Sequence, residues 1–66
     1  NKDIQKVIDE LKDELKIPFL RCVEGFKYKE ISEELNLPIG TVKSRIFLAR
    51  KEMVQKLKHD YGHYLN

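Results

Sequence analysis

Apolar residues recur along this chain at helical intervals of three and four positions, and no alternating strand pattern persists. The spacing predicts helices over about 3 to 11, 12 to 24 and 28 to 35, and a fourth from about 38 into the high fifties. We expect the fourth helix to reach about Tyr61 and to stop at Gly62. The pattern therefore predicts an all-α, small four-helix domain.

Glycine, asparagine and proline mark the predicted helix ends. Gly25 can take the positive φ that closes the second helix, and Asn36 can take the left-handed conformation that closes the third. Pro38 pre-sets φ for the first turn of the fourth helix. Pro18 falls within the second helix, which it either bends or replaces with a shorter helix after a break at residues 16 and 17. The sequence leaves both alternatives open.

The segment ISEELNLPIGTVKSRIFLARK, residues 31 to 51, is the most informative part of the chain. A short helix, a break at residues 36 to 38 and a longer basic helix are typical of a helix-turn-helix, whose second helix enters the major groove of DNA. Ser32 offers a small side chain where the two helices approach each other closely. We therefore expect a winged-helix-like DNA-binding class without strands, in a single domain over residues 1 to 66 with a tail from about 58 to 66.

The fourth helix has distinct faces when it is drawn as a wheel of 100° per residue. Its core face holds Val42, Ile46, Ala49, Met53 and Leu57. The opposite strip holds Gly40, Ser44, Phe47, Leu48 and Lys51, with Lys43 and Arg50 along one flank and Arg45 and Thr41 along the other. This arrangement places cations on both sides of a mixed polar and apolar strip.

Such a strip suits a DNA groove, because flanking cations can contact the two phosphate backbones while the centre faces base edges. Gly40 allows a close approach of the backbone, and Ser44 can donate or accept a hydrogen bond. Phe47 offers an apolar surface to a thymine methyl group, and Lys51 can reach a guanine edge or a phosphate. The helix N-terminus also favours a nearby phosphate.

Two of these side chains have a structural alternative. Phe47 could pack on an earlier helix or on the rest of a longer protein, rather than on a base. Arg45 could pair with an acid on the third helix, such as Glu30 or Glu34, rather than with a phosphate. The sequence alone does not decide either case.

Charge is unevenly distributed over the 66 residues, whose net charge is +2. Residues 1 to 34 hold seven Lys or Arg and nine Asp or Glu, a net of −2, whereas residues 35 to 66 hold six and two, a net of +4. This imbalance indicates a polyanionic partner for the second half. Because the chain begins at Asn1 without a methionine, we expect it to be a fragment of a longer protein.

The single cysteine and the short apolar runs bear on location. Cys22 is alone, which excludes an internal disulfide and fits a cytoplasmic protein, and we expect it to be a buried small apolar side chain. No stretch approaches the roughly 20 apolar residues needed to cross a membrane, so no membrane partner is expected.

The sequence does not favour an enzyme, a cofactor or a metal site. His59 and His63 are four residues apart, but they lack the third ligand that would complete a site, since Asp60 falls on a different face. The acids Glu24, Glu30, Glu33 and Glu34 are too scattered to form a catalytic pair. The chain also lacks a glycine-rich phosphate loop and a nucleophile elbow.

The run EGFKYKEISEELNLPIGTVKSRIFLARKEM, residues 24 to 53, closely resembles region 4 of bacterial RNA polymerase sigma factors. The branch is the extracytoplasmic-function (ECF) type of the sigma-70 family. The matching positions are Glu24-Gly25, Tyr28, Glu30-Ile31, Leu35, residues 40 to 45, and Ala49-Arg50. Three positions depart from the pattern: Leu48 replaces a frequent basic residue, Lys27 replaces a serine that often caps the third helix, and Ser32 replaces an alanine.

The resemblance implies recognition of the −35 element of double-stranded promoter DNA, in support of transcription initiation. It also implies docking on the β flap of the RNA polymerase core, and an anti-sigma factor as a further candidate partner. Carried onto matching positions, DNA contact falls to Lys43, Ser44, Phe47 and Arg50, with Thr41 and Arg45 beside them. Together with the wheel, the candidate DNA-binding residues are Gly40, Thr41, Lys43, Ser44, Arg45, Phe47, Arg50 and Lys51.

Two other functions remain open from the sequence. One is the helix-turn-helix output domain of a response regulator, which uses a similar Thr-Val-Lys run. The other is a protein-interaction module whose basic face binds an acidic partner, a function that an exposed Phe47 and Leu48 would also suit.

Overall fold

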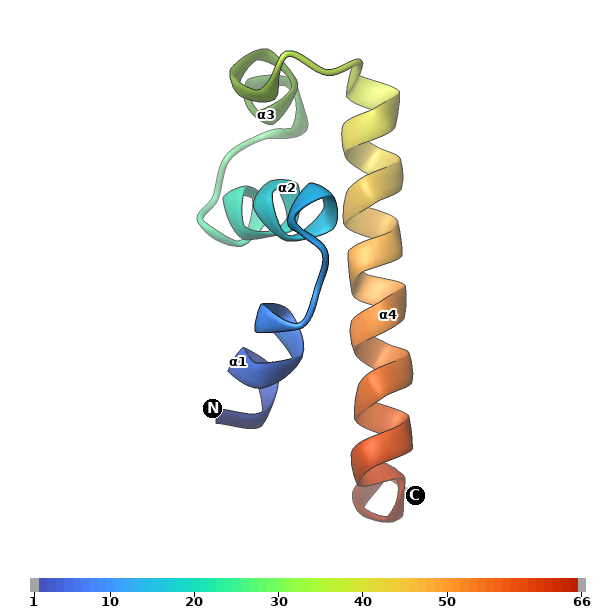
Figure 1. The fold of residues 1–66 in the computed structure, drawn as a ribbon. Coiled ribbons are helices and arrows are strands. Elements are labelled where there is room, and N and C mark those ends of the chain that lie inside the picture. The colour runs from blue at the N-terminus through green and yellow to red at the C-terminus, as the bar shows by residue number, and fades with distance from the viewer. Residues whose placement is uncertain (1, 66) are drawn as a thin grey trace.

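The computed structural model describes the backbone of residues 2 to 65 and the side chains of residues 4 to 58. Four helices follow one another: α1 (Lys2–Asp9), α2 (Asp13–Val23), α3 (Tyr28–Leu35) and α4 (Ile39–Leu65). Figure 1 shows α4 as a long rod, with α1, α2 and α3 placed in order along one side of it. No strand occurs between residues 2 and 65, so the predicted all-α four-helix domain is confirmed.

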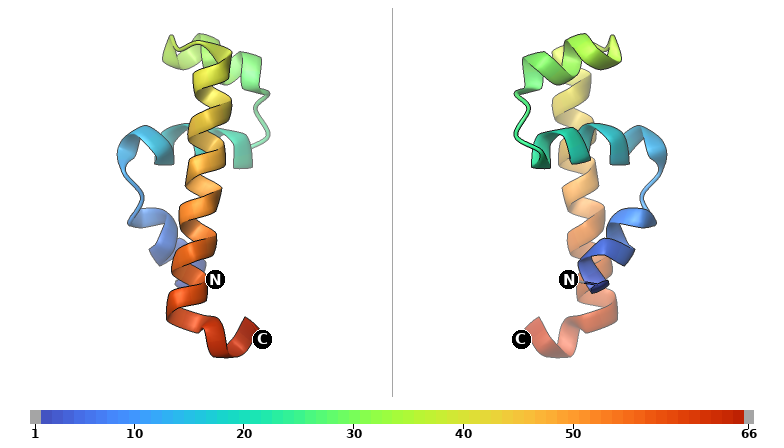
Figure 2. Two further views of the ribbon diagram at one scale, coloured as in Figure 1. Left: turned by 90° about the vertical axis from the view of Figure 1, so that its right-hand side faces the viewer. Right: turned by 90° about the vertical axis from the view of Figure 1, so that its left-hand side faces the viewer.

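The long helix sets the shape of the molecule, which measures 40 × 19 × 18 Å along its principal axes. The two views in Figure 2 show α2 crossing α4 rather than running beside it. Each of the three shorter helices packs against α4, and α2 also packs against α3. Within the described residues, no helix combines the length and apolar character that a membrane crossing requires.

The first two helices are separated by a short turn rather than meeting at residues 11 and 12 as predicted. The backbone of Lys12 is extended, with φ −63° and ψ 147°, and the Lys12 carbonyl accepts the first hydrogen bonds of α2, from the N–H groups of Leu15 and Lys16. This turn lets Leu11, which is 3% exposed, pack with Leu15 in the core. Burial of Leu11 therefore decides where α1 ends, a tertiary effect that the helical period does not contain.

The predicted stop of the last helix at Gly62 is wrong, because α4 continues to Leu65. A glycine inside a helix weakens it by about 1 kcal/mol but does not end it unless a turn requires positive φ. Consequently the backbone of the expected tail, from residue 58, continues α4 as far as Leu65.

The predicted roles of Gly25 and Asn36 are confirmed. Gly25 follows α2 with φ 103°, and Asn36 follows α3 in the left-handed region with φ 55° and ψ 49°. A Cβ added to Gly25 would meet nothing within 4 Å, so its backbone conformation rather than crowding calls for glycine. Pro18 is buried and lies inside α2, which runs without a break from Asp13 to Val23. The alternative of a shorter helix that begins after residues 16 and 17 is therefore wrong.

Two clusters of buried apolar side chains hold the helices together. One contains Leu11, Leu15, Phe19 and Ala49, which joins α2 and the turn before it to the middle of α4. The other contains Ile31, Val42 and Ile46, which joins α3 to the first half of α4. The second cluster thus fixes the two helices of the predicted helix-turn-helix relative to each other, and it will be called the α3–α4 cluster.

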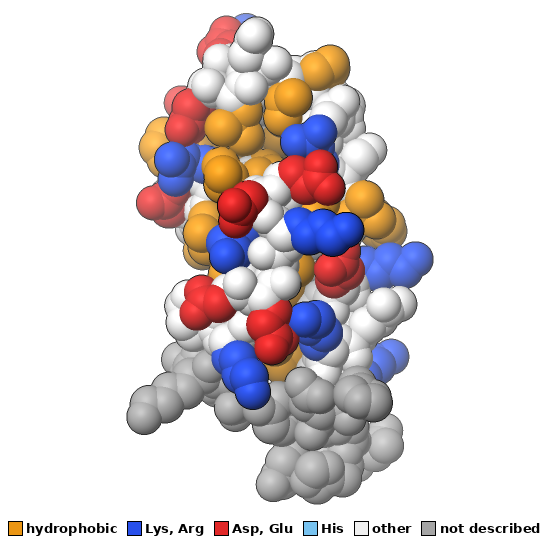
Figure 3. Space-filling model, in the orientation of Figure 1, with side chains coloured by type: hydrophobic (Ala, Val, Ile, Leu, Met, Phe, Trp, Pro, Cys, Tyr) orange, Lys and Arg blue, Asp and Glu red, His pale blue; other side chains and the backbone are white. Residues whose placement is uncertain are grey.

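Exposed ion pairs add a link between α2 and α3 and a link between α4 and the turn that follows α1. The Arg21 Nε of α2 donates to both carboxylate oxygens of Glu34 on α3, at 3.1 and 2.9 Å, and its Nη1 donates to Glu24 at 3.1 Å. Lys56 Nζ of α4 donates to the carboxylate of Glu10 at 3.0 Å. On the face drawn in Figure 3, acidic and basic side chains are interspersed over the described part of the chain.

Candidate nucleic-acid interface

The turn between α3 and α4 is closed by hydrogen bonds within a few residues. The Leu37 N–H donates to the Ser32 carbonyl at 3.0 Å, and the Ser32 hydroxyl donates back to the Leu37 carbonyl. The Thr41 N–H then donates to the Pro38 carbonyl at 3.0 Å, which begins the hydrogen bonding of α4. Ser32 was expected to act through its small size alone. Its hydroxyl also ties the turn, which an alanine at this position could not do.

The start of α3 shows the effect of the lysine at its cap position. Lys27 makes no side-chain cap hydrogen bond, because an ammonium group carries no acceptor. The Glu30 carboxylate instead accepts from the Lys27 backbone N–H at 2.8 Å, which satisfies one of the free donors at the helix start. The absence of a serine-type cap on this helix, anticipated from Lys27, is confirmed.

Burial confirms the predicted core face over the first part of α4, whereas Met53 and Leu57 farther along that face are only half-buried. Val42, Ile46 and Ala49 are at most 1% exposed, whereas the opposite strip and the first flank are open to solvent. The exposed candidates are Gly40, Lys43, Ser44, Phe47, Leu48, Arg50 and Lys51, and the half-buried ones are Thr41 and Arg45. A Cβ added to Gly40 would meet nothing within 4 Å, so packing within the described chain does not require glycine there.

Phe47 does not pack on an earlier helix, since its side chain is 64% exposed. Leu48, next to it, is 45% exposed. A single exposed apolar side chain is common, but Phe47 and Leu48 are neighbours, which makes this surface a candidate for contact with another molecule.

The alternative in which Arg45 pairs with an acid of α3 is wrong for the described side chains. Glu34 is bound by Arg21, and Glu30 accepts from the Lys27 backbone, so both acids are engaged elsewhere. Arg45 instead borders a shallow groove, whose other lining residues are Asp13, Glu14, Ile17, Pro18, Leu35 and Leu37. Among the described side chains, Arg45 therefore lies at a groove formed with α2 rather than in an ion pair across the helix-turn-helix.

Two cations of the first flank contact side chains from other helices. Lys43 Nζ lies 6.0 Å from the centre of the Tyr28 ring. Arg50 Nη2 donates to Cys22 Sγ at 3.7 Å. Cys22 packs against the α3–α4 cluster as a small side chain, but it is half-buried rather than buried as predicted.

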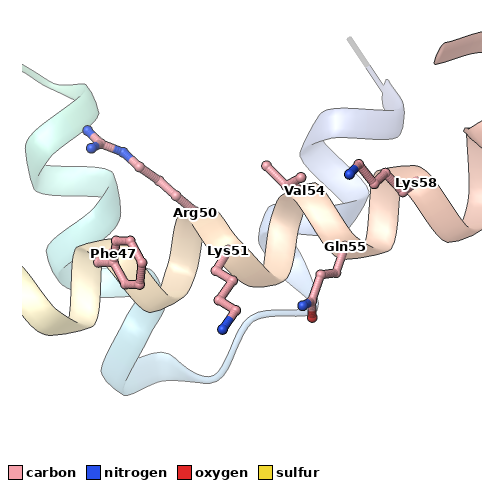
Figure 4. A pocket seen from close by; sticks show the side chains of 6 residues that line it. All are labelled: Phe47, Arg50, Lys51, Val54, Gln55 and Lys58. Carbon is pink, nitrogen blue, oxygen red and sulfur yellow. The ribbon is translucent and has the colours of Figure 1, made fainter. Parts of the chain in front are cut away.

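A shallow groove, which was not predicted from the sequence, continues the strip toward the C-terminal half of α4. Its lining residues, labelled in Figure 4, are Phe47, Arg50, Lys51, Val54, Gln55 and Lys58. In that view Arg50 and Lys51 extend to opposite sides of the helix. Val54 is 51% exposed, and its helical spacing of seven residues from Phe47 was the available indication. His59 and His63 lie outside the described side chains.

A helix-turn-helix with an exposed strip between cations on its second helix is the architecture of a DNA-binding domain. The family model for sigma-70, region 4 matches residues 1–53, and the chain belongs to this family of non-enzymatic DNA-binding domains. The response-regulator alternative is not favoured. The comparison with solved structures found no match.

Curated relatives are similar over most of this chain. The ECF RNA polymerase sigma-E factor of Haemophilus influenzae is 42% identical over 52 residues, which cover 77% of this chain and 28% of that protein. The proteins of the same name from Escherichia coli K12 and Salmonella typhimurium LT2 are each 37% identical over 54 residues, which cover 80% of this chain. The chain thus spans 28% of the length of these relatives.

Proposed function

We propose that this domain recognises the −35 element of promoter DNA, as region 4 of an extracytoplasmic-function sigma factor. The observation that carries the proposal is the exposed strip on α4, which lies opposite the buried Val42, Ile46 and Ala49. Cations border this strip, and a tied turn fixes it relative to α3. Membership of the sigma-70 region 4 family and the names of the relatives support the same function.

The residues divide into phosphate contacts and base contacts. Lys43 and Arg50 bind phosphates along one border of the groove, and Arg45 and Thr41 bind phosphates along the other. A phosphate backbone is a row of anions, so cations on both borders set the register of the helix without reading sequence.

Base recognition falls to the centre of the strip. Ser44 exchanges a hydrogen bond with a base edge, and Phe47 packs on an apolar group such as a thymine methyl. Gly40 lets the start of α4 come close to the DNA, and Lys51 contacts a guanine edge or a phosphate near the groove's far end. Leu48 supplies an apolar contact at the position where it departs from the region 4 pattern, and this departure alters the preferred DNA sequence.

The complete sigma factor supplies the remaining partners. Region 4 docks on the β flap of the RNA polymerase core, which places the −35 contact at a fixed distance from the start site. An anti-sigma factor that covers this domain would prevent that docking or the DNA contact. These partners place the protein in the cytoplasm, and residues 1 to 66 act as one domain within the longer chain.

Amide chemical shifts of the labelled 66-residue chain test the proposal. A duplex is first selected from a random-sequence pool by its binding to the chain, and it is then compared with a scrambled duplex of the same composition. We expect the selected duplex to shift amides of residues 40 to 51 more strongly, whereas amides of α1 serve as an internal reference. Equal shifts with both duplexes, or shifts away from α4, would contradict the proposed function and favour a partner-binding module.

A further inference from the structure

Two of the proposed phosphate-binding cations rest against side chains that come from other helices. The 6.0 Å between Lys43 Nζ and the Tyr28 ring centre is within the range of a cation–π interaction. The 3.7 Å between Arg50 Nη2 and Cys22 Sγ is a long hydrogen bond to a weak sulfur acceptor. Tyr28 is the first residue of α3, and Cys22 lies in the last turn of α2, so each contact ties α4 to a different helix.

The two supporting side chains are themselves held by the core. Tyr28 and Cys22 are both half-buried and pack against the α3–α4 cluster, whereas Lys43 and Arg50 are exposed. Lys43 and Arg50 are seven residues apart, which places them on one flank of α4 at about 10.5 Å from each other along the axis. A half-buried ring and a half-buried sulfur thus contact the two exposed cations of a single flank.

We infer that Tyr28 and Cys22 are positioning residues of the DNA interface, which hold Lys43 and Arg50 toward one phosphate strand before DNA binds. The inference rests on the proposed function and goes beyond it, because neither residue belongs to the strip or its flanks. It assigns the preorganisation of that flank to α2 and α3 rather than to the recognition helix alone.

Neutral partners are what make this arrangement useful for binding an anion. Arg21 has two carboxylate partners that balance its charge, and the hydrogen bonds that it donates to Glu34 and Glu24 raise its pKa. A ring face and a thiol restrain Lys43 and Arg50 without cancelling their charge. Long cationic side chains lose rotamer freedom when they bind, so restraint in the free protein lowers the entropic cost of each phosphate contact. For one such side chain this corresponds to a change of about two- to tenfold in affinity.

A double-mutant cycle on the 66-residue chain tests the first pair. Tyr28→Leu removes the ring and keeps an apolar side chain, and we expect it to weaken binding of the selected duplex about threefold. The same substitution in a Lys43→Ala background should have no further effect, because the restrained cation is already absent. Tyr28→Phe keeps the ring and should bind like the wild type. The matched control pairs Tyr28→Leu with Lys51→Ala, for which the two losses should add.

The second pair is tested in the same way, with Cys22→Ala and Arg50→Ala. Cys22→Ala should weaken DNA binding about twofold in the wild-type background and leave it unchanged in Arg50→Ala. In the free wild-type chain we also expect slower motion at the Arg50 Nε–H than in the Cys22→Ala variant.

For the first pair, the free chain offers a direct measurement of the contact. An upfield ring-current shift of the Lys43 Hε protons should be present in the wild type and in Tyr28→Phe, and absent in Tyr28→Leu.

The outcomes separate the inference from the function on which it rests. Losses for Tyr28→Leu that are equal in the wild-type and Lys43→Ala backgrounds would show that Tyr28 only supports the fold, and would overturn the inference. If the wild-type chain lacks the Lys43 ring-current shift, the inference is also overturned. This measurement still decides the question if circular dichroism shows that Tyr28→Leu does not fold. Because phosphates occur in every duplex, coupling should persist on scrambled DNA. Coupling without any sequence preference would therefore overturn the proposed −35 recognition and leave the positioning roles supported.

Discussion

The exposed ring of Phe47 offers the sharpest test of how this domain reads a DNA sequence. Replacing it with alanine removes the largest apolar group of the strip while the buried side of α4 stays unchanged. We expect Phe47→Ala to reduce discrimination between the selected and scrambled duplexes more than it reduces affinity for DNA in general. The reason is that a ring packed on a base contributes only where the matching base is present.

The size of the effect follows from the exposed area. Phe47 is 64% exposed, and an aromatic side chain has roughly 200 Å² to bury, so about 130 Å² is available for contact. If a base covers half of this area, about 65 Å² leaves water, which at about 25 cal/mol per Å² stabilises the complex by about 1.6 kcal/mol. The loss on the selected duplex should then be slightly more than tenfold. Stability of the free chain should change by less than about 0.5 kcal/mol, as for an exposed position.

Isothermal titration calorimetry at one salt concentration measures the affinity for the selected duplex and for the scrambled duplex, and their ratio gives the discrimination. A urea titration measures the free energy of unfolding. Val54→Ala is the matched control, because Val54 is also exposed on α4 but lies beyond the proposed base contacts. It should leave discrimination unchanged. Equal losses on both duplexes for Phe47→Ala would refute the base contact and assign the ring to another partner.

Three further predictions concern charge, core packing and pH. Lys43→Ala should weaken binding to all sequences alike and lower the slope of log K against log salt by about one, as measured by titrations at several salt concentrations; an unchanged slope would exclude a phosphate contact. Ile31→Ala should lower the free energy of unfolding by about 2–5 kcal/mol in urea, because Ile31 is 0% exposed, whereas Ile39→Ala, at a residue 44% exposed, should cost far less. The hydrogen bond that Lys56 donates to Glu10 lowers the pKa of this carboxyl group in the folded chain below its ordinary value of 4.5. The ionised carboxylate therefore stabilises the folded chain above pH 4.5. This contribution is lost as the pH falls through the lowered pKa of the folded chain. Thermal melts should therefore show wild type more stable than Glu10→Gln at neutral pH, with a difference that shrinks in acid; a difference independent of pH would contradict this pair.

The helical period predicted much of the core, because apolar residues recur every three or four positions along the helices. On α4 it separated the buried Val42 and Ile46 from the exposed Phe47, and the structure confirms that separation. Residues with a restricted backbone, Gly25 and Asn36, were also predicted correctly, since their chemistry alone accounts for a positive φ. These are local properties, and local properties are what a single sequence encodes most directly.

Contacts between distant side chains could not be predicted in the same way. From the sequence, Glu34 on the neighbouring helix was a candidate partner for Arg45. In the structure, Arg21 of α2 donates hydrogen bonds to the Glu34 carboxylate instead. The contact between Cys22 and Arg50 joins residues 28 apart, and it depends on how α2 lies across α4. Periodicity fixes which face a residue occupies, but the crossing of two helices decides which side chains meet.

The single long helix links the two halves of the molecule mechanically. The first half of α4 carries the exposed strip and packs on α3. Farther along the helix, Ala49 packs on α2, and Lys56 binds Glu10 in the turn that follows α1. The N-terminal helices therefore hold the exposed strip through a rigid element rather than through a flexible linker. A contact that moved α2 would directly affect the flank of Lys43 and Arg50, because Cys22 of α2 lies against Arg50. In a complete sigma factor, a partner bound to α2 would thus act on the same flank that we propose to bind phosphate.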